Sequence, residues 1–168
     1  KPMATIDNLK AAFAGESQAN RKYLAFARKA EADGFPQIAK LFKAAAEAET
    51  VHAHSHLRVM GGIGNTEENL KDAISGEAHE FKTMYPAFIA EAEKEGHKQA
   101  ITTFKYANDV EKVHHDLYTE ALQKFKDGQH LPAADIHVCG VCGYTVAGAV
   151  PERCPVCGSV SKVFRKIE

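Results

Sequence analysis

A glutamate followed three residues later by a histidine occurs twice in the sequence, at Glu49 and His52 and again at Glu111 and His114. On an α-helix this spacing puts a carboxylate and an imidazole on one face, one turn apart. In four-helix bundles that bind two irons, two helices carry such a pair and the other two each supply a glutamate, all pointing inward. The two pairs therefore predict a helical bundle around a di-iron carboxylate site.

The region around these pairs has the composition of long helices. Residues 5–126 are rich in Ala, Glu, Lys and Leu, and breaking residues at 33–36, 61–65 and 95–96 divide them. We expect four helices, the third with Thr66 as its N-cap and with a kink at Pro86. Apolar residues recur along each helix at steps of three or four, as in a bundle core. The predicted fold class is an all-α four-helix bundle.

The two halves of the helical region repeat each other. A glutamate that follows a glycine precedes each pair, with 33 residues from Glu16 to Glu49 and 34 from Glu77 to Glu111. A single glutamate is usually a solvated surface charge. Carboxylates on core-facing positions need compensating cations, however, so the repeat favours metal ligands. Glu80 breaks the symmetry, since its counterpart in the first half is an alanine.

The four cysteines form a second candidate metal site near the C-terminal end. They occur as two Cys-x-x-Cys-Gly motifs, at Cys139 and Cys142 and at Cys154 and Cys157. Clustered pairs favour metal binding over disulfides, and four thiolates suit one iron or one zinc in tetrahedral geometry. A module of about 32 residues is also short for folding without a metal. The motifs alone leave open which metal binds.

We expect three parts: a helical domain at 3–128, a linker at 129–136 and the cysteine module at 137–168. The net charge of −1, without a dominant basic patch, argues against a nucleic-acid partner. No apolar run approaches the roughly 18 residues of a membrane span, so we expect no membrane partner. No export signal precedes the first helix, and together with the clustered cysteines this favours the cytoplasm.

On these motifs the sequence resembles the rubrerythrin family, over nearly the whole chain. The matching stretches are 13–19, both Glu-x-x-His pairs, 76–80 with the Met-Tyr-Pro at 84–86, and the cysteine tail. The resemblance implies a ferritin-like four-helix bundle with a small C-terminal rubredoxin-like β/loop domain. It implies two irons in the bundle and one iron at the cysteines. Tyr144 and Pro155, which flank the cysteines, favour iron over zinc at that site.

The resemblance also implies which residues bind and react. The implied di-iron ligands are Glu16, Glu49, His52, Glu77, Glu80, Glu111 and His114. The implied ligands of the single iron are Cys139, Cys142, Cys154 and Cys157. The glutamates of the two pairs are expected to bridge the irons, and the glutamates that follow glycine to be terminal ligands.

Four residues are expected to act in the reaction. His114 is expected to bind one iron throughout, while the other iron exchanges Glu80 for His52 on reduction. Glu80, once freed, is a candidate proton relay. Tyr23 and Tyr85 resemble tyrosines that hydrogen-bond ligand carboxylates, and the alternative for both is an ordinary core aromatic.

The resemblance implies a cytoplasmic non-haem peroxidase that reduces hydrogen peroxide to water. Electrons would come from NAD(P)H through a separate reductase or rubredoxin, and would pass through the four-cysteine iron to the di-iron site. One alternative is a ferritin-like protein that oxidises or stores iron, which would not need the thiolate site. Another is a redox-sensing or binding module whose cysteines hold zinc.

The short link between the second and third helices points to a dimer. If these helices run parallel, as in a ferritin-like bundle, the link must return about 28 Å between the ligand levels. Residues 61–65 and their flanks span about 20 Å when extended. We therefore expect a homodimer in which the first two helices of one chain complete the site of the other. A head-to-tail arrangement would deliver the electron to the partner chain.

Overall fold

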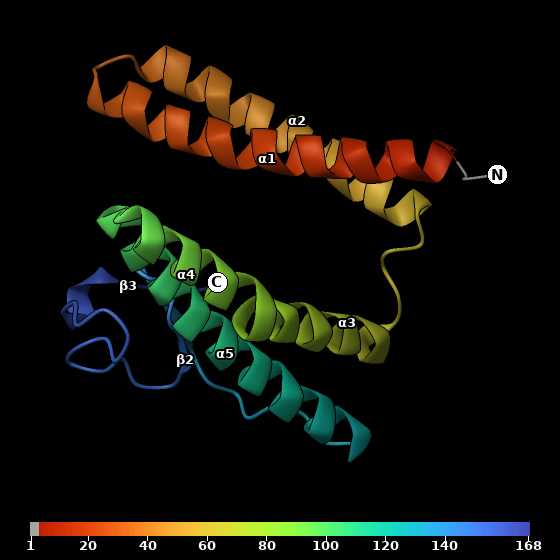
Figure 1. Cartoon of the computed structure of the whole chain (residues 1–168). Helices are drawn as coiled ribbons and strands as arrows, with labels where there is room; N and C mark the ends of the chain where they lie inside the picture. The colour runs from red at the N-terminus through yellow and green to blue at the C-terminus, as the bar shows by residue number, and fades with distance from the viewer. Residues whose placement is uncertain (1–3) are drawn as a thin grey trace. The chain divides into compact units, whose positions relative to one another are not determined.

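The computed structural model of the chain describes residues 4–168 (Figure 1). Met3, the first residue of the expected helical domain, lies outside them. The described residues are mainly helical, with a small cysteine-bearing β region near the C-terminal end, as predicted. The chain divides into two compact units, with the boundary between Gly64 and Asn65. The expected domain limits stay a prediction. None of the described helices is long and apolar enough to cross a membrane.

The first unit is a hairpin of two helices, α1 (Ala4–Ala32) and α2 (Pro36–Val59), which lie side by side (Figure 1). Small residues line the seam, because Ala27, Ala39 and Ala46 are almost completely buried. Short side chains let two helices approach closely, so the seam holds the hairpin together without large residues. Large apolar residues are left exposed, among them Leu41 at 70%.

A polar contact fixes the register of this hairpin. Asn20 is buried on α1, and its Nδ2 donates to the Ala46 carbonyl and to Thr50 Oγ1 on α2, both at 2.8 Å. Thr50 Oγ1 in turn donates to the same carbonyl at 3.1 Å. Buried polar groups are costly unless they are hydrogen-bonded, so alternative registers that break these bonds are disfavoured.

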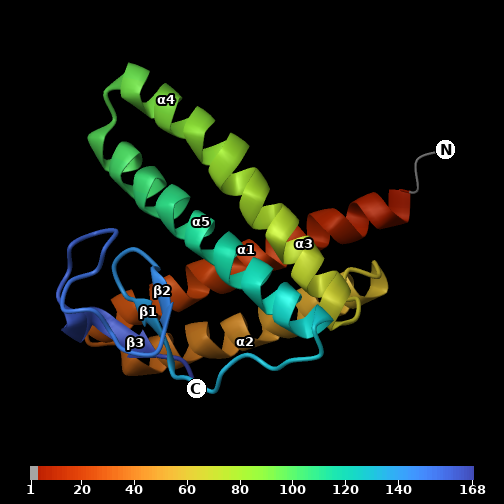
Figure 2. The same ribbon diagram turned by 90° about the horizontal axis from the view of Figure 1, so that it is seen from below.

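The second unit opens with a helical rod that lies against α5 (Lys98–Lys126) (Figure 2). The rod consists of α3 (Thr66–His79), the π-helical segment η1 (Glu80–Met84) and α4 (Tyr85–Glu95). The prediction of one helix kinked at Pro86 was therefore wrong. Pro86 lies in the first turn of α4, where its missing N–H costs little, and the irregular backbone comes just before it.

The start of α3 also differs from the prediction by one residue. Its N-cap is Asn65, not Thr66. Asn65 Oδ1 accepts a hydrogen bond from the Glu68 N–H, and Glu68 Oε2 accepts one from the Asn65 N–H. This reciprocal capping box satisfies two backbone donors, the N–H groups of Asn65 and Glu68. A cap at Thr66 would not satisfy these two donors.

The C-terminal module is a three-stranded antiparallel sheet with two loops. The strands β1 (Ile136–Cys139), β2 (Thr145–Ala147) and β3 (Phe164–Lys166) lie in the order β2-β1-β3, and η2 (Ser161–Val163) precedes β3. Each cysteine loop closes on a glycine with positive φ: Gly143 N–H donates to the Cys139 carbonyl, and Gly158 N–H to the Cys154 carbonyl. The matched turns direct four cysteines to one point.

Candidate metal centres

The first hairpin brings together three of the predicted ligands, which we call the first cluster: Glu16 of α1 with Glu49 and His52 of α2. One ligand atom from each lies within 4.8 Å of the others. His52 Nδ1 lies 2.9 Å from Glu49 Oε2 and 3.9 Å from Glu16 Oε1. The His52 side chain is 54% exposed, so this cluster is open to solvent on the histidine side.

The second unit holds a matching second cluster: Glu77 of α3 with Glu111 and His114 of α5. His114 Nδ1 lies 2.9 Å from Glu111 Oε2 and 3.7 Å from Glu77 Oε1, nearly the same distances as in the first cluster. The His114 side chain is only 27% exposed. Each cluster offers three ligands of the type that di-iron bundles use, half of the six that such a site takes.

The ionisable groups of the second cluster favour the binding of a cation. Burial, a hydrogen bond with Glu111 and the negative charge of Glu111 together raise the pKa of Glu77 to about 7. The hydrogen bond from His114 lowers the pKa of Glu111, and the same bond raises the pKa of His114. Two carboxylates this close resist ionising together, and bound metal ions would remove that conflict.

Glu80 lies beside the second cluster but is not one of its three grouped ligands. Burial, and to a lesser degree the charge of Glu111, raises the pKa of Glu80, which indicates that its carboxyl lies near the cluster in a partly enclosed position. Glu80 is also the first residue of η1. The residue that breaks the sequence repeat is therefore the residue at which the helix changes its winding.

The π-helical segment explains a one-residue irregularity in the repeat. His52 and His114 are 62 positions apart, but Glu16 and Glu77 are only 61 apart. After η1 the spacing is 62 again, as between Tyr23 and Tyr85. A π-helical turn accommodates one extra residue in a helix, and such turns occur often at functional sites. The rod thus carries its insertion between Glu77 and Tyr85, where Glu80 lies.

The two predicted tyrosines occupy equivalent places in the two units. Tyr23 packs against Phe26 and Phe42, and Tyr85 packs against Phe88 and Phe104, with ring centroids 6.1 to 6.3 Å apart. Burial raises the pKa of Tyr85, and the nearby carboxylates Glu111, Glu80 and Glu77 raise it further. Tyr85 therefore lies close enough to the second cluster to sense its charge. The predicted hydrogen bonds to ligand carboxylates stay a prediction.

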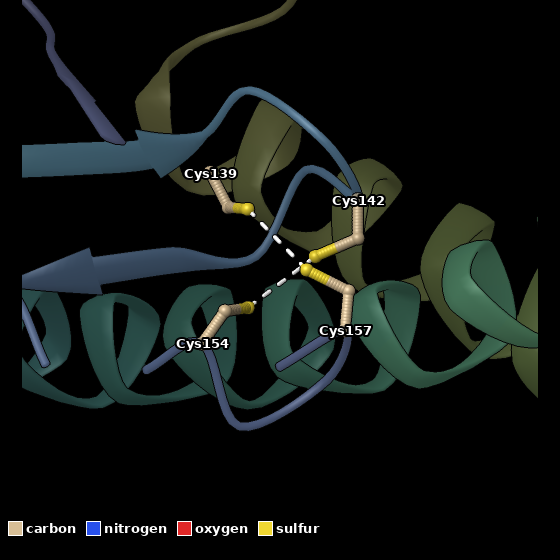
Figure 3. Close-up of side chains that lie close together, drawn as sticks. All are labelled: Cys139, Cys142, Cys154 and Cys157. Atoms are coloured by element: carbon tan, nitrogen blue, oxygen red, sulfur yellow. Dashed lines mark hydrogen bonds between the residues drawn. The ribbon is translucent and has the colours of Figure 1, made fainter. Parts of the chain in front are cut away.

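The four cysteine side chains converge from the two loops and point toward one another (Figure 3). The sulfurs of Cys139 and Cys157 are 3.7 Å apart, and those of Cys142 and Cys154 are 3.5 Å apart. A tetrahedron with metal–sulfur bonds of about 2.3 Å has edges of about 3.8 Å. The cysteines are all free thiols, so the arrangement fits one tetrahedral metal ion and needs little rearrangement to hold it.

The surroundings of the sulfurs differ from one cysteine to another. Burial raises the pKa of Cys142, although the backbone N–H of Tyr144 acts in the opposite direction. Burial also acts to raise the pKa of Cys157, but hydrogen bonds with the side chain and backbone of Ser159 and with the sulfurs of Cys154 and Cys142 together lower it to about 6. Donors aimed at the sulfurs stabilise thiolates, the form that binds metal.

One residue beside the second cluster was missed by the sequence analysis. Thr145, the first residue of β2, has its Oγ1 2.9 Å from His114 Nε2. It lies 31 residues away in the sequence, in a different module, and a threonine three residues after a cysteine carries no recognisable signal.

Residues 7–122 match the protein family described as rubrerythrin, and residues 137–165 match the rubredoxin-like domain of rubrerythrin. The chain belongs to the rubrerythrin family. This confirms the resemblance seen in the motifs. Rubrerythrins have a di-iron site and a rubredoxin-like iron site, and the chain supplies a Glu/His set and a four-cysteine set for them. It is thus a member of a family of di-iron oxidative-stress proteins.

Relatives match the chain over almost its full length. Rubrerythrin-2 of Clostridium acetobutylicum is 36% identical, over 98% of this chain and 97% of its own. Nigerythrin of Nitratidesulfovibrio vulgaris is also 36% identical, over 92% and 82%. A solved structure described as the partially reduced state of nigerythrin has a TM-score of 0.59 at 34% identity, and the match covers 97% of this chain and 86% of that one. The chain is therefore similar both to rubrerythrins and to nigerythrin.

Proposed function

We propose that the protein is a non-haem di-iron peroxidase that reduces hydrogen peroxide to water and protects the cytoplasm from oxidative stress. The observation that carries the proposal is the presence of two kinds of metal-binding set in one chain. The Glu/His clusters suit a pair of irons, and the four-cysteine site suits a single iron that exchanges electrons. A protein that only oxidised or stored iron would have no use for the cysteine site.

The chain's own residues would hold the metals and move protons. The glutamates of the two Glu-x-x-His pairs, Glu49 and Glu111, would hold the irons together with Glu16 and Glu77. Bound iron would supply the electrons for cleavage of the O–O bond. His114 is more enclosed, and its Nε2 is hydrogen-bonded to Thr145, which suits a permanent ligand that binds through Nδ1. The open position of His52 suits a ligand that binds in only one oxidation state.

Glu80 would carry a proton to the leaving oxygen. It begins the π-helical segment beside the second cluster, so it can bind in one state and be released in the other without displacing Glu77. Tyr85 would hydrogen-bond and orient carboxylates of the second cluster, and Tyr23 would do the same in the first cluster. The electrons would come from a rubredoxin or an NAD(P)H-dependent reductase through the four-cysteine iron.

The test uses the iron-loaded protein, reduced and then mixed with peroxide. We expect the wild type to be reoxidised with one peroxide consumed per two electrons, and Glu80→Ala to lose this reaction while keeping both kinds of iron. Glu91→Ala, at an exposed position paired with Lys94, is the matched control and should react like the wild type. Reoxidation of Glu80→Ala at the wild-type rate would refute the role of Glu80.

The same protein separates the proposal from its rivals. A red thiolate–iron absorption that dithionite bleaches supports the electron-transfer role of the cysteines. A colourless cysteine site that contains zinc, with rapid oxidation of added ferrous iron by oxygen, would favour the iron-oxidising alternative. NAD(P)H-dependent turnover with an added reductase would then establish the source of electrons.

We also propose that the protein is a homodimer in which the first hairpin of one chain completes the site of the other. Each cluster has three ligands in matching geometry, so one cluster of each kind makes a six-ligand set. The first hairpin cannot cover its own apolar side chains, and Ile38, Leu41 and Val59 are all about half exposed or more. The link from Val59 to Thr66 is also short for a return along the bundle.

Co-expression of two damaged chains tests this exchange. Glu16→Ala damages the first cluster and Glu77→Ala damages the second. In an exchanged dimer of one chain of each kind, one site is intact and the other carries both defects. In an unexchanged dimer both sites carry one defect. Recovery of one intact iron-binding site in the mixed dimer, but in neither variant alone, is the expected result, and no recovery would refute the exchange.

A further inference from the structure

The cysteine module touches α5 of its own chain beside the second cluster. Gly143 of the first cysteine loop lies against Val110, since a β-carbon on Gly143 would be 3.7 Å from Val110 Cγ1. Val110 is itself 97% buried, being only 3% exposed. One turn along α5, His114 Nε2 meets Thr145 Oγ1 at 2.9 Å. Both contacts lie within the second unit, so a single chain makes them.

The two hydrogen bonds of Thr145 determine which ring nitrogen of His114 carries a hydrogen. Thr145 Oγ1 donates its hydrogen to the Gly143 carbonyl at 3.1 Å. Its remaining lone pairs can only accept, so His114 must donate from Nε2. A histidine whose Nε2 carries the hydrogen has Nδ1 free for a metal, and Nδ1 is the atom that faces Glu111 and Glu77.

We propose that Thr145 is a positioning residue that joins the two metal sites of one chain. Its hydroxyl holds the His114 ring with the hydrogen on Nε2, which leaves Nδ1 free for a metal ion held by the carboxylates, and it anchors the cysteine module on the α5 of the same chain. The role in electron delivery rests on the proposed function, but the role in orienting His114 does not. The electron would then pass within one chain, and not between chains as a head-to-tail dimer would require.

The contact also makes a short connection between the metal sites. Cys142 is covalently joined to Gly143, whose carbonyl accepts from Thr145, and Thr145 accepts from His114. In the loaded protein one electron would leave the ferrous iron of the cysteine site and reduce one ferric iron at the His114 site. No atom is transferred, and the Nε2 hydrogen remains on the imidazole.

A cavity of about 500 Å³ lies beside the bond, between α5, the linker and the sheet. Apolar residues line most of it, including Leu117 and Ala121 of α5, Leu131 of the linker and Ile136 of β1. Because the module does not pack tightly here, loss of the Thr145 bond should have a measurable effect on its position.

The first experiment observes the His114 ring directly in the full chain loaded with zinc, which is diamagnetic. Nitrogen-15 spectra of the histidines should show a His114 Nε2–H that exchanges slowly with water. Thr145→Val keeps the side-chain shape but removes the hydroxyl, and exchange should become about fivefold faster or more, the factor that corresponds to about 1 kcal/mol. Thr145→Ser keeps the hydroxyl and should resemble the wild type.

Thr102→Val is the matched control, because the Thr102 hydroxyl donates to the Lys98 carbonyl of its own helix, far along α5 from His114. It should leave the His114 signal unchanged. Equal Nε2–H exchange in the wild type and Thr145→Val would overturn the proposal, as would a His114 signal with the hydrogen on Nδ1 instead of Nε2.

The second experiment follows electron transfer in the iron-loaded, fully reduced protein after one equivalent of peroxide. In Thr145→Val the colour of the oxidised cysteine site should return about fivefold more slowly or worse, since the same bond is lost. Thr145→Ser and Thr102→Val should match the wild type, and an unchanged rate in Thr145→Val would overturn the electron-delivery part. A wild type that does not consume peroxide would overturn the proposed function alone, because the zinc spectra would still decide the role of Thr145 at His114.

Discussion

The contact between Asn20 and Thr50 makes a prediction about the first cluster. Asn20 lies four residues after Glu16 on α1, and Thr50 directly follows Glu49 on α2. The hydrogen bonds of Asn20 therefore set the register that brings Glu16 to Glu49 and His52. Asn20→Leu keeps most of the volume but removes both donated bonds. At about 1 kcal/mol for each bond, α1 and α2 should lose about 2 kcal/mol of protection against opening.

Hydrogen exchange read by mass spectrometry on the full chain measures this loss segment by segment. We expect faster exchange in residues 4–59 of Asn20→Leu and no change in residues 136–168. Iron should bind less tightly at the first cluster, by about tenfold for each 1.4 kcal/mol that reaches the site. Gln18→Ala, an exposed change on the same helix, is the control and should leave both measurements unchanged.

A double variant makes the reasoning refutable. Thr50→Val alone should also cost about 2 kcal/mol, because the bond from Asn20 and the bond to the Ala46 carbonyl are both lost. If Asn20 and Thr50 act through each other, the double variant should lose less than the sum of the single losses. Wild-type exchange in Asn20→Leu, or strictly additive losses, would show that the contact does not set the register.

Three further predictions follow from the second unit. In the metal-free folded chain the pKa of Glu77 is about 7 instead of the ordinary 4.5. The contribution of this group to stability therefore falls as the pH rises from about 4.5 to about 7. Thermal unfolding of Glu77→Gln should lack this decline, and the same decline in both proteins would contradict the assignment. Asn65→Ala should cost about 1 kcal/mol through loss of the capping box, seen as faster hydrogen exchange at the start of α3, whereas Asn65→Asp should be nearly neutral. Gly143→Ala should destabilise the cysteine module, because its φ of 87° is strained for alanine; slower loss of the cysteine-bound metal to a chelator than in the wild type would be inconsistent with this.

Much of the fold and the candidate ligand set follows from local spacing. A Glu-x-x-His pair shares a helical face wherever the helix forms, and a Cys-x-x-Cys-Gly motif closes its own turn. The start of α3 was predicted to within one residue of its N-cap Asn65, because a capping residue acts within one turn of the helix end. Such features need no knowledge of the rest of the molecule.

Other features had no local signal. The π-helical segment at Glu80–Met84 has ordinary helical composition, and only the change in repeat spacing from 61 to 62 marks it. The prediction placed the irregularity at Pro86 because proline is the usual cause of a kink. The Asn20–Thr50 contact joins residues 30 positions apart, and nothing near either residue indicates the other.

The sequence by itself determined which candidate metal ligands lie next to one another, because covalent spacing and helical geometry place Glu49 beside His52 and Cys139 beside Cys142. Only the tertiary structure decided what surrounds them. It placed Thr145 on His114 and Gly143 on Val110, since contacts between segments far apart in the chain depend on how two modules pack. That packing turns two independent metal-binding motifs into connected parts of one chain.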